Sequence, residues 1–204
     1  IHAHAILTDI LEPRGSGFVG HHGDDFLKAN NAQFVGFSTE IGPEGAVYML
    51  DWHDAEICSG PVRNSDTGRV YRILPTESKA EKWDGRYDDI RSLSNSELVD
   101  LQLSKSAWHS RRARVVLQNR AAKGQVQEES HAALRELFES NTNGDHRLRA
   151  LWALHVSGGI DETGLSEALH DGDEYIRAWA IQLLCEDKAP GSAVRSQFAS
   201  MAKE

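Results

Sequence analysis

Cysteine is scarce in this sequence, and its two cysteines form no recognisable site. Cys58 and Cys185 lie far apart, and neither belongs to a CxxC or CxxCH pattern. This spacing predicts no disulfide framework, no zinc site and no covalently attached haem. We interpret both thiols as ordinary, partly buried side chains.

Surplus positive charge and long apolar runs are also missing. The 22 Lys and Arg residues are outnumbered by 31 Asp and Glu residues, and the formal net charge at pH 7 is −9. A negative surplus opposes binding to a phosphate backbone, so we expect no nucleic-acid partner. No apolar run approaches the roughly 20 residues that cross a bilayer, and no stretch has the pattern of a secretory signal. We therefore expect no membrane insertion by this segment.

What remains is the composition of an ordinary globular protein. The chain has 204 residues, of which 40% are hydrophobic and 26% are charged, which is enough for one domain or two small ones. It starts at Ile1 rather than at Met, and a helical pattern continues to its end without a stop signal. We expect it to be a piece of a longer protein.

Residues 1–75 have the pattern of strands and turns. Short β-branched or aromatic runs alternate with clusters of Gly, Pro, Asn and Asp, which is typical of β structure. Pro and Gly in residues 12–15 and 42–45 predict two tight turns. The expected strands are residues 5–11, 16–20, 34–41, 46–52 and 69–74. If these strands pair in order as an antiparallel meander, the long connections 21–33 and 53–68 emerge at one edge of the sheet.

A polar linker is expected over residues 76–93, and paired helices over residues 94–204. Ser94 followed by Glu97 is a capping box, which predicts a helix start. Three later segments resemble one another, each with an Arg-Ala pair early in an expected helix: residues 106–117, 144–154 and 171–183. Helix pairs that recur at a few tens of residues indicate an α-solenoid. The third segment resembles the HEAT repeat, and we count roughly three such units.

The apolar spacing within these helices predicts which side chains they bury. Ile176, Trp179, Ala180, Leu183 and Leu184 follow the spacing of one helix face. We expect core positions for Trp108, Trp152 and Trp179. Because Arg112, Arg149 and Arg177 recur with the repeat, we expect them to fix helix packing rather than to bind an anion.

Motifs in both parts resemble one family. Gly-Pro-Glu-Gly-x-x-Tyr at residues 42–48 and Asp-Trp-His-Asp at residues 51–54 look like the closing blade of a β-propeller of the glucose/sorbosone dehydrogenase type. Together with the helical segments, they are similar to the membrane-bound dehydrogenases of planctomycetes and verrucomicrobia. The resemblance covers almost the whole chain. It implies an α+β protein in two parts, with antiparallel propeller blades followed by an α-solenoid of HEAT-like repeats.

The resemblance also implies an activity and a setting. The chain would be a fragment of an oxidoreductase that oxidises a sugar or other alcohol and passes electrons to a haem module outside this chain. Pyrroloquinoline quinone, calcium and haem c are implied for the full-length parent, as is a periplasmic or membrane-associated location. The expected partners are the remaining propeller blades, further HEAT repeats and a cytochrome c module. One blade and part of another cannot close a propeller, so we expect the isolated chain to be inactive.

Two groups of polar residues are candidates for chemistry at the edge with the long connections. His53 is the preferred general base, because the neighbouring carboxylates of Asp51 and Asp54 could orient its imidazole. Glu56 follows in the same loop. The alternative is that Asp51 caps a turn and Trp52 fills the core. The second group, a candidate calcium or metal site with a solvated loop as its alternative, comprises His21, His22, Asp24 and Asp25.

Other functions remain open at this point. The helical array could be a scaffold that offers a groove to a protein partner, beside a blade that has lost catalysis. A propeller hydrolase or lactonase that uses bound calcium is a third hypothesis. A CxxCH motif downstream and further blades upstream in the parent reading frame would favour the oxidoreductase.

Overall fold

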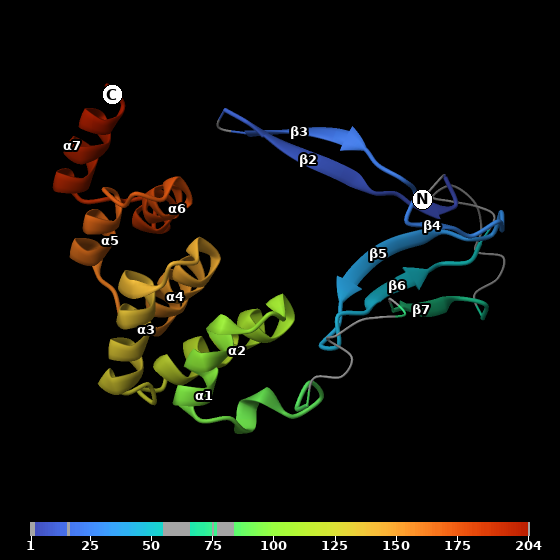
Figure 1. Cartoon of the computed structure of the whole chain (residues 1–204), viewed down its shortest axis with the longest axis horizontal. Helices are drawn as coiled ribbons and strands as arrows, with labels where there is room; N and C mark the ends of the chain where they lie inside the picture. Colours follow the sequence, from blue (N-terminus) through green and yellow to red (C-terminus); the bar gives the residue numbers. More distant parts are fainter. Residues whose placement is uncertain (1–2, 16, 55–65, 75, 77–83, 204) are drawn as a thin grey trace. The chain divides into compact units, whose positions relative to one another are not determined.

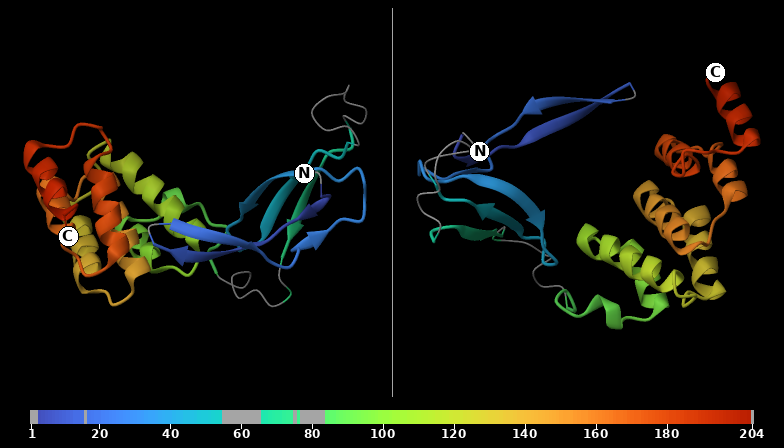
Figure 2. Two further views of the ribbon diagram at one scale, coloured as in Figure 1. Left: turned by 90° about the horizontal axis from the view of Figure 1, so that it is seen from above. Right: turned by 180° about the vertical axis from the view of Figure 1, so that it is seen from behind.

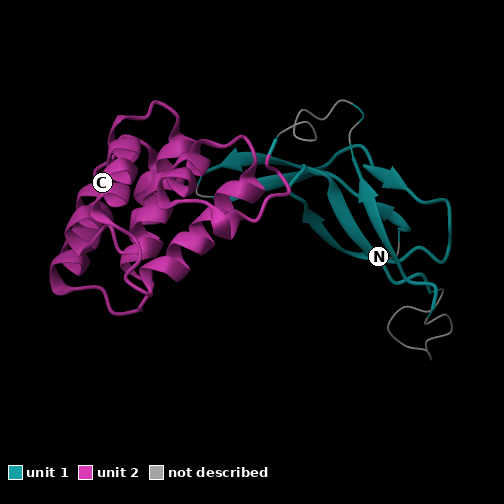
Figure 3. Ribbon diagram, turned by 90° about the horizontal axis from the view of Figure 1, so that it is seen from below, with its two compact units in different colours: residues 1–84 teal, residues 85–204 magenta. Residues whose placement is uncertain are grey.

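A computed structural model describes residues 3–15, 17–54, 66–74, 76 and 84–203. The chain divides into two compact units, residues 1–84 and 85–204 (Figure 3). The first contains only strands and the second only helices among the described residues. This is the mixed α+β organisation expected from the sequence. No described helix is long and apolar enough to cross a membrane.

The first unit begins with a long β-hairpin. β1 (Ala5–Ile6) pairs with β4 (Leu27–Lys28), and β2 (Asp9–Arg14) pairs with β3 (Gly17–His22), both antiparallel. The expected turn at residues 12–15 is wrong in extent, because β2 continues through Pro13, which lies opposite Phe18. A two-stranded ribbon tolerates proline where its nitrogen faces away from the partner strand. The chain turns only at Gly15, whose φ of 58° suits glycine.

The rest of the first unit is a three-stranded antiparallel sheet. Its order is β5 (Gly36–Ile41), β6 (Val47–Asp51) and β7 (Arg69–Ile73), with an irregular register between Gly36 and Ser38 (Figure 1). The meander is therefore confirmed for these three strands. It does not include β3, because β4 folds back onto β1 instead of leading into a strand beside β5. The described residues show no closed barrel or propeller.

The two faces of this sheet differ in how well they are covered. Met49 lies on one face and is buried, and Ile6, Leu7 and Phe26 of the hairpin lie near Thr39, Ile41 and Val47 on that side. On the other face, Leu50 and Val70 lie directly opposite each other. They remain 41% and 66% exposed. One face of the sheet thus carries apolar side chains that nothing described in this unit covers.

The second unit is built from helices in two layers. Figure 1 shows α2, α4 and α6 in one layer, with α1, α3 and α5 in a second layer against them. The right-hand view of Figure 2 shows the same helices from behind. The expected start at Ser94 is confirmed, since both hydrogen bonds of its capping box with Glu97 form. The helices are α1 (Asn95–Asp100), α2 (Ala107–Ala121), α3 (Glu128–Ser140), α4 (Gly144–Ser157), α5 (Glu162–Ala168), α6 (Glu174–Leu184) and α7 (Ser192–Met201), with short 3₁₀ turns η2 (Ile90–Ser92) and η3 (Leu101–Leu103).

Two apolar clusters form the core of this unit. The predicted stripe is confirmed at Ile176, Ala180 and Leu184, which are buried, whereas Trp152 and Trp179 are partly buried against the same cluster. Trp108 is partly buried but belongs to neither cluster, so its predicted core position is wrong; its ring contacts His109 and Arg112. The first cluster is Leu148, Leu151, Leu165, Ala168, Leu169, Ile176, Ala180, Leu184 and Val194, and the second is Leu98, Val99, Ala113, Leu117, Leu134, Ala153 and Leu154.

Arginine side chains hold the turns between the helices of this unit. Arg149 donates to the backbone carbonyls of Gln102 and Ser104, and Arg177 donates to those of Asp171 and Gly172. Arg147 forms a paired hydrogen bond with the Asp171 carboxylate at 3.1 and 2.5 Å. The inter-helix turns are thus fixed by guanidinium groups. The packing role predicted for Arg149 and Arg177 is confirmed.

Candidate functional site

Asp51 organises the end of the three-stranded sheet. It lies at the end of the central strand, opposite Gly36 on one side and Arg69 on the other. Its side chain is buried, and Oδ1 accepts hydrogen bonds from the backbone N–H of Val35 at 2.7 Å and of His53 at 2.9 Å. Asp51 therefore caps the end of the sheet, which the alternative interpretation of the sequence anticipated.

His53 is held by bonds to both ring nitrogens. The residue is only 4% exposed, and its backbone has a positive φ of 52°. Nδ1 lies 3.2 Å from Asp51 Oδ2, and Nε2 lies 3.0 Å from Nη2 of Arg69. A guanidinium group can only donate hydrogen bonds, so Nε2 must accept and the ring proton must lie on Nδ1, facing Asp51. The structure thus brings His53 and Asp51 together in the orientation of a carboxylate–imidazole pair.

Arg69 and Tyr71 complete this chain of contacts, and no sequence pattern singled them out. Arg69 is exposed, and its Nη1 donates to the Tyr71 hydroxyl at 3.1 Å. The alternation of side chains along a strand places residues 69 and 71 on one face of β7. Only the β6–β7 register, which pairs Asp51 with Arg69, reveals that this face meets His53.

The other residues near the predicted catalytic group differ in burial. Asp54 is buried directly after His53. Trp52 is half exposed and contacts the half-exposed Phe37, so its predicted role as a core plug is wrong. Glu56 and Cys58 lie outside the described residues.

The predicted metal group does not converge. His21 contacts Glu12, whereas His22, its neighbour in β3, contacts Asp9 and Asp25. Both imidazoles are more than half exposed, Asp24 is exposed, and Asp25 also pairs with Lys28. Within the described ranges, no three His, Cys, Asp or Glu side chains are placed to hold a metal ion. Successive residues of a strand point to opposite faces, which explains why the His21–His22 pair cannot act together here.

The two long connections, residues 21–33 and 53–68, were expected at one edge of the sheet. Of their described residues, only some lie there. The chain enters β5 and leaves β6 at the same end, where Trp52 N–H bonds to Val35 O and the His4 ring bonds to Phe34 O at 2.7 Å. The second connection starts there, but residues 55–65 lie outside the described part. His21 and His22 belong to the hairpin strand β3 and not to this end of the sheet.

The turn at the opposite end of the sheet contains a buried carboxylate that serves the fold. Glu44 Oε1 accepts from the Tyr48 hydroxyl at 2.6 Å and from Arg72 Nε at 2.7 Å. Burial by itself would raise the pKa of Glu44, but the bonds from Tyr48 and Arg72 outweigh it and hold the pKa below its usual 4.5. The Gly-Pro-Glu-Gly-x-x-Tyr motif is thus a locked turn.

Comparison with protein-family models, with curated proteins and with solved structures found no match to this chain.

Proposed function

We propose that this chain supplies a terminal blade and a HEAT-like helical array to a larger β-propeller oxidoreductase that acts on a sugar or other alcohol. The observation that carries the proposal is the Asp51–His53 pair at the end of a three-stranded antiparallel meander. A carboxylate that orients an imidazole is the arrangement used by histidine general bases. The sequence resemblance described above supplies the reaction class.

The uncovered face of the sheet supports its assignment as a blade. Leu50 and Val70 pair on this face and are exposed, and Phe37 and Trp52 are also half exposed. An apolar sheet face is stable when a second layer covers it. A neighbouring propeller blade elsewhere in a longer parent would be such a layer.

In the proposed reaction, His53 must exchange one hydrogen bond. Nε2 can accept the proton of a substrate hydroxyl only after Arg69 leaves it. Arg69 is exposed, so this exchange moves a surface side chain and leaves the Asp51–His53 contact intact. Asp51 would then stabilise the imidazolium that forms.

The implied cofactors find no complete site among the described residues. Calcium would need several convergent oxygen ligands, and neither His21, His22, Asp24 and Asp25 nor any other described acidic group provides them. The sequence contains no CxxCH motif for haem c. Pyrroloquinoline quinone, calcium and haem c are therefore assigned to the rest of the proposed parent.

The experiment is dye-linked alcohol oxidation by the full-length parent. We expect His53→Ala to lower kcat by at least about a hundredfold, the usual contribution of a general base. Arg69→Ala, which frees Nε2 without removing the base, is the control and should retain far more activity. Because His53 is buried, thermal stability is measured for each variant and rates are compared on folded protein.

Two results would contradict this proposal. One is an intact parent whose kcat is unchanged by His53→Ala. The other is turnover by the 204-residue chain alone, because a propeller site is assembled from several blades and one sector cannot position a substrate.

A second candidate function is an interaction scaffold formed by the helical unit. The observation that favours it is the layer of α2, α4 and α6, in which α4 contacts both α2 and α6. Stacked helix pairs of this kind offer extended surfaces to protein partners.

A further inference from the structure

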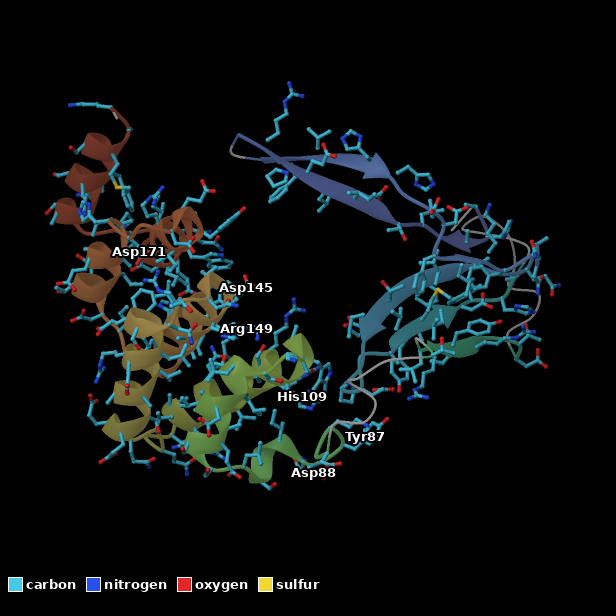
Figure 4. The ribbon with its side chains drawn as sticks, in the orientation of Figure 1. Tyr87, Asp88, His109, Asp145, Arg149 and Asp171 are labelled. Atoms are coloured by element: carbon cyan, nitrogen blue, oxygen red, sulfur yellow. The ribbon has the colours of Figure 1, made fainter. Side chains whose placement is uncertain are left out.

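Arginines gather where α2 lies against α4. Arg111 and Arg114 are one turn apart on α2. Arg149, which Figure 4 labels, lies on α4. Their charges act on one another: burial, followed by the neighbouring Arg149 and Arg111 guanidinium groups, lowers the pKa of Arg114 to about 10. A cluster of like charges at a half-buried position is unfavourable unless something else compensates it.

No carboxylate of the described residues compensates this cluster. Arg114 donates to the side-chain carbonyl of Gln102 at 3.2 Å, and Arg149 uses Nη1 for the carbonyls of Gln102 and Ser104. Nε and Nη2 of Arg149 make no hydrogen bond within the described chain, and Asp145, one turn earlier, forms no ion pair with it. By contrast, Arg147 and Arg72 each have a carboxylate.

The local charge is also one-sided. α2 contains Arg111, Arg112, Arg114 and Arg120 but no acidic residue, in a chain whose net charge is −9. Arg120 is occupied by Asn95 and by backbone carbonyls, and Arg112 stacks on Trp108 on another side of the helix. Arg111 is exposed without an ion pair among the described residues, and the charge of Arg114 meets only the neutral Gln102 side chain and the Trp152 ring.

An aromatic donor lies beside the arginines. The Arg114 guanidinium is 5.0 Å from the centre of the Trp152 ring, and Trp152 meets Trp179 edge to face at 4.9 Å. The Nε1 of Trp152 is buried and has no hydrogen-bond partner among the described residues. A buried donor without an acceptor is costly, so this N–H is a further unsatisfied group, in the residue on which Arg114 packs.

We propose that the surface formed by Arg111, Arg114, Arg149 and Trp152 binds an acidic peptide segment of a partner protein. Glutamate or aspartate carboxylates of the peptide pair with the guanidinium groups, which present planar sets of donors. Apolar side chains of the peptide contact the exposed Val115, one position after Arg114. The inference rests on the scaffold role and is independent of the oxidoreductase proposal.

The test uses the 204-residue chain and three short fluorescein-labelled peptides in which Glu, Gln or Lys alternates with Leu and Gly. We expect the Glu peptide to bind in fluorescence anisotropy and its affinity to fall as ionic strength rises. The Gln and Lys peptides should bind at least about tenfold more weakly. In a ¹H–¹⁵N spectrum, the indole signal that Trp152→Phe removes should shift when the Glu peptide is added.

Variants on one helix make the test specific. Arg111→Gln and Arg114→Gln should each weaken binding of the Glu peptide by about tenfold. Arg112→Gln removes the same charge from the same helix but points away from the cluster, and it should bind as the unchanged chain does. Because replacing Arg114 also removes its bond to the buried Gln102 side chain and its contact with the Trp152 ring, thermal unfolding is measured for each variant and binding is compared on folded protein.

The outcomes distinguish failure of the acidic-peptide site from failure of the scaffold role. Equal losses for Arg111→Gln and Arg112→Gln, or equal binding of single-stranded DNA, would show unselective anion attraction and overturn the site. Preference for the Gln or Lys peptide would overturn the acidic partner and leave the scaffold role standing. If none of the three peptides binds, both fail.

Discussion

Glu44 is the residue whose environment is most completely defined in the first unit. It is buried in the β5–β6 turn, where Tyr48 and Arg72 donate to the same carboxylate oxygen. Its other oxygen, Oε2, is buried without a hydrogen-bond partner among the described residues. The stability of the turn therefore depends on the negative charge of the Glu44 carboxylate and on the two donors, Tyr48 and Arg72, from neighbouring strands.

Glu44→Gln should destabilise the first unit by about 1–3 kcal/mol at neutral pH, because a neutral amide is a weaker acceptor for two donors. The lowered pKa of Glu44 means that the carboxylate adds stability above about pH 4.5. This stability is lost as the pH falls through the lower folded-state pKa. Urea unfolding between pH 3 and pH 7 should show that the variant lacks this acid-dependent loss.

Glu40→Gln is the matched control, since Glu40 is exposed on the adjoining strand β5. It should unfold as the unchanged chain does at every pH. Equal effects of the two substitutions would show that the Glu44 network does not stabilise the turn.

At the residue scale, the sequence predicted the pairs that are close along the chain. Asp51 and His53 are two residues apart, and the pairing of their side chains was expected and is observed. Arg69 reaches His53 across a strand register, which no local pattern reveals. The exposure of Trp52 was missed for the same reason, because whether a strand-end aromatic is covered depends on what packs above it.

At the element scale, the most reliable predictions came from residues that contact each other within one helical turn. The capping box at Ser94 was expected and forms, with Ser94 Oγ accepting from Glu97 N–H. The Pro-Gly turn predicted at residues 12–15 begins only at Gly15, because proline fits both a turn and the free side of a strand. Which of these applies is decided by the pairing of Pro13 with Phe18, a contact that the residue types alone do not encode.

Ser94→Ala should lower the stability of the helical unit by about 1 kcal/mol, the usual cost of losing an N-cap. Thermal unfolding followed by circular dichroism at 222 nm measures it. Ser192→Ala serves as the control, because Ser192 begins α7 and its side chain makes no hydrogen bond within the described residues. A midpoint unchanged by Ser94→Ala would mean that α1 unfolds separately from the two core clusters.

At the scale of the whole molecule, the change from a two-residue to a 3.6-residue period predicted the division into a strand unit and a helix unit. The observed boundary after Asp84 falls inside the expected linker over residues 76–93. The pairing of strands across the first unit was not predicted, since the return of β4 onto β1 competes with pairing to β5. Such competition is decided by long-range contacts.

The helical unit should fold without the strands. Its two apolar clusters contain only residues from Ile90 onward, so residues 85–204 expressed alone should unfold cooperatively. Residues 1–84 leave Ile10, Leu11, Phe18 and Val70 exposed, and they should bind the dye ANS roughly severalfold more strongly. Non-cooperative melting of residues 85–204, or equal dye binding by both pieces, would contradict this.

The proline inside the hairpin has a further consequence for how the chain behaves when crowded with its own copies. A two-stranded ribbon has two open edges, and an open edge can recruit a strand from another molecule and propagate into a fibril. Pairing of β2 with β3 continues through Pro13, so the Pro13 nitrogen lies on the outer edge and has no hydrogen to offer. An incoming strand would lose one bond of its ladder there. Pro13, near the end of β2, therefore weakens the addition of a further strand at that edge of the hairpin.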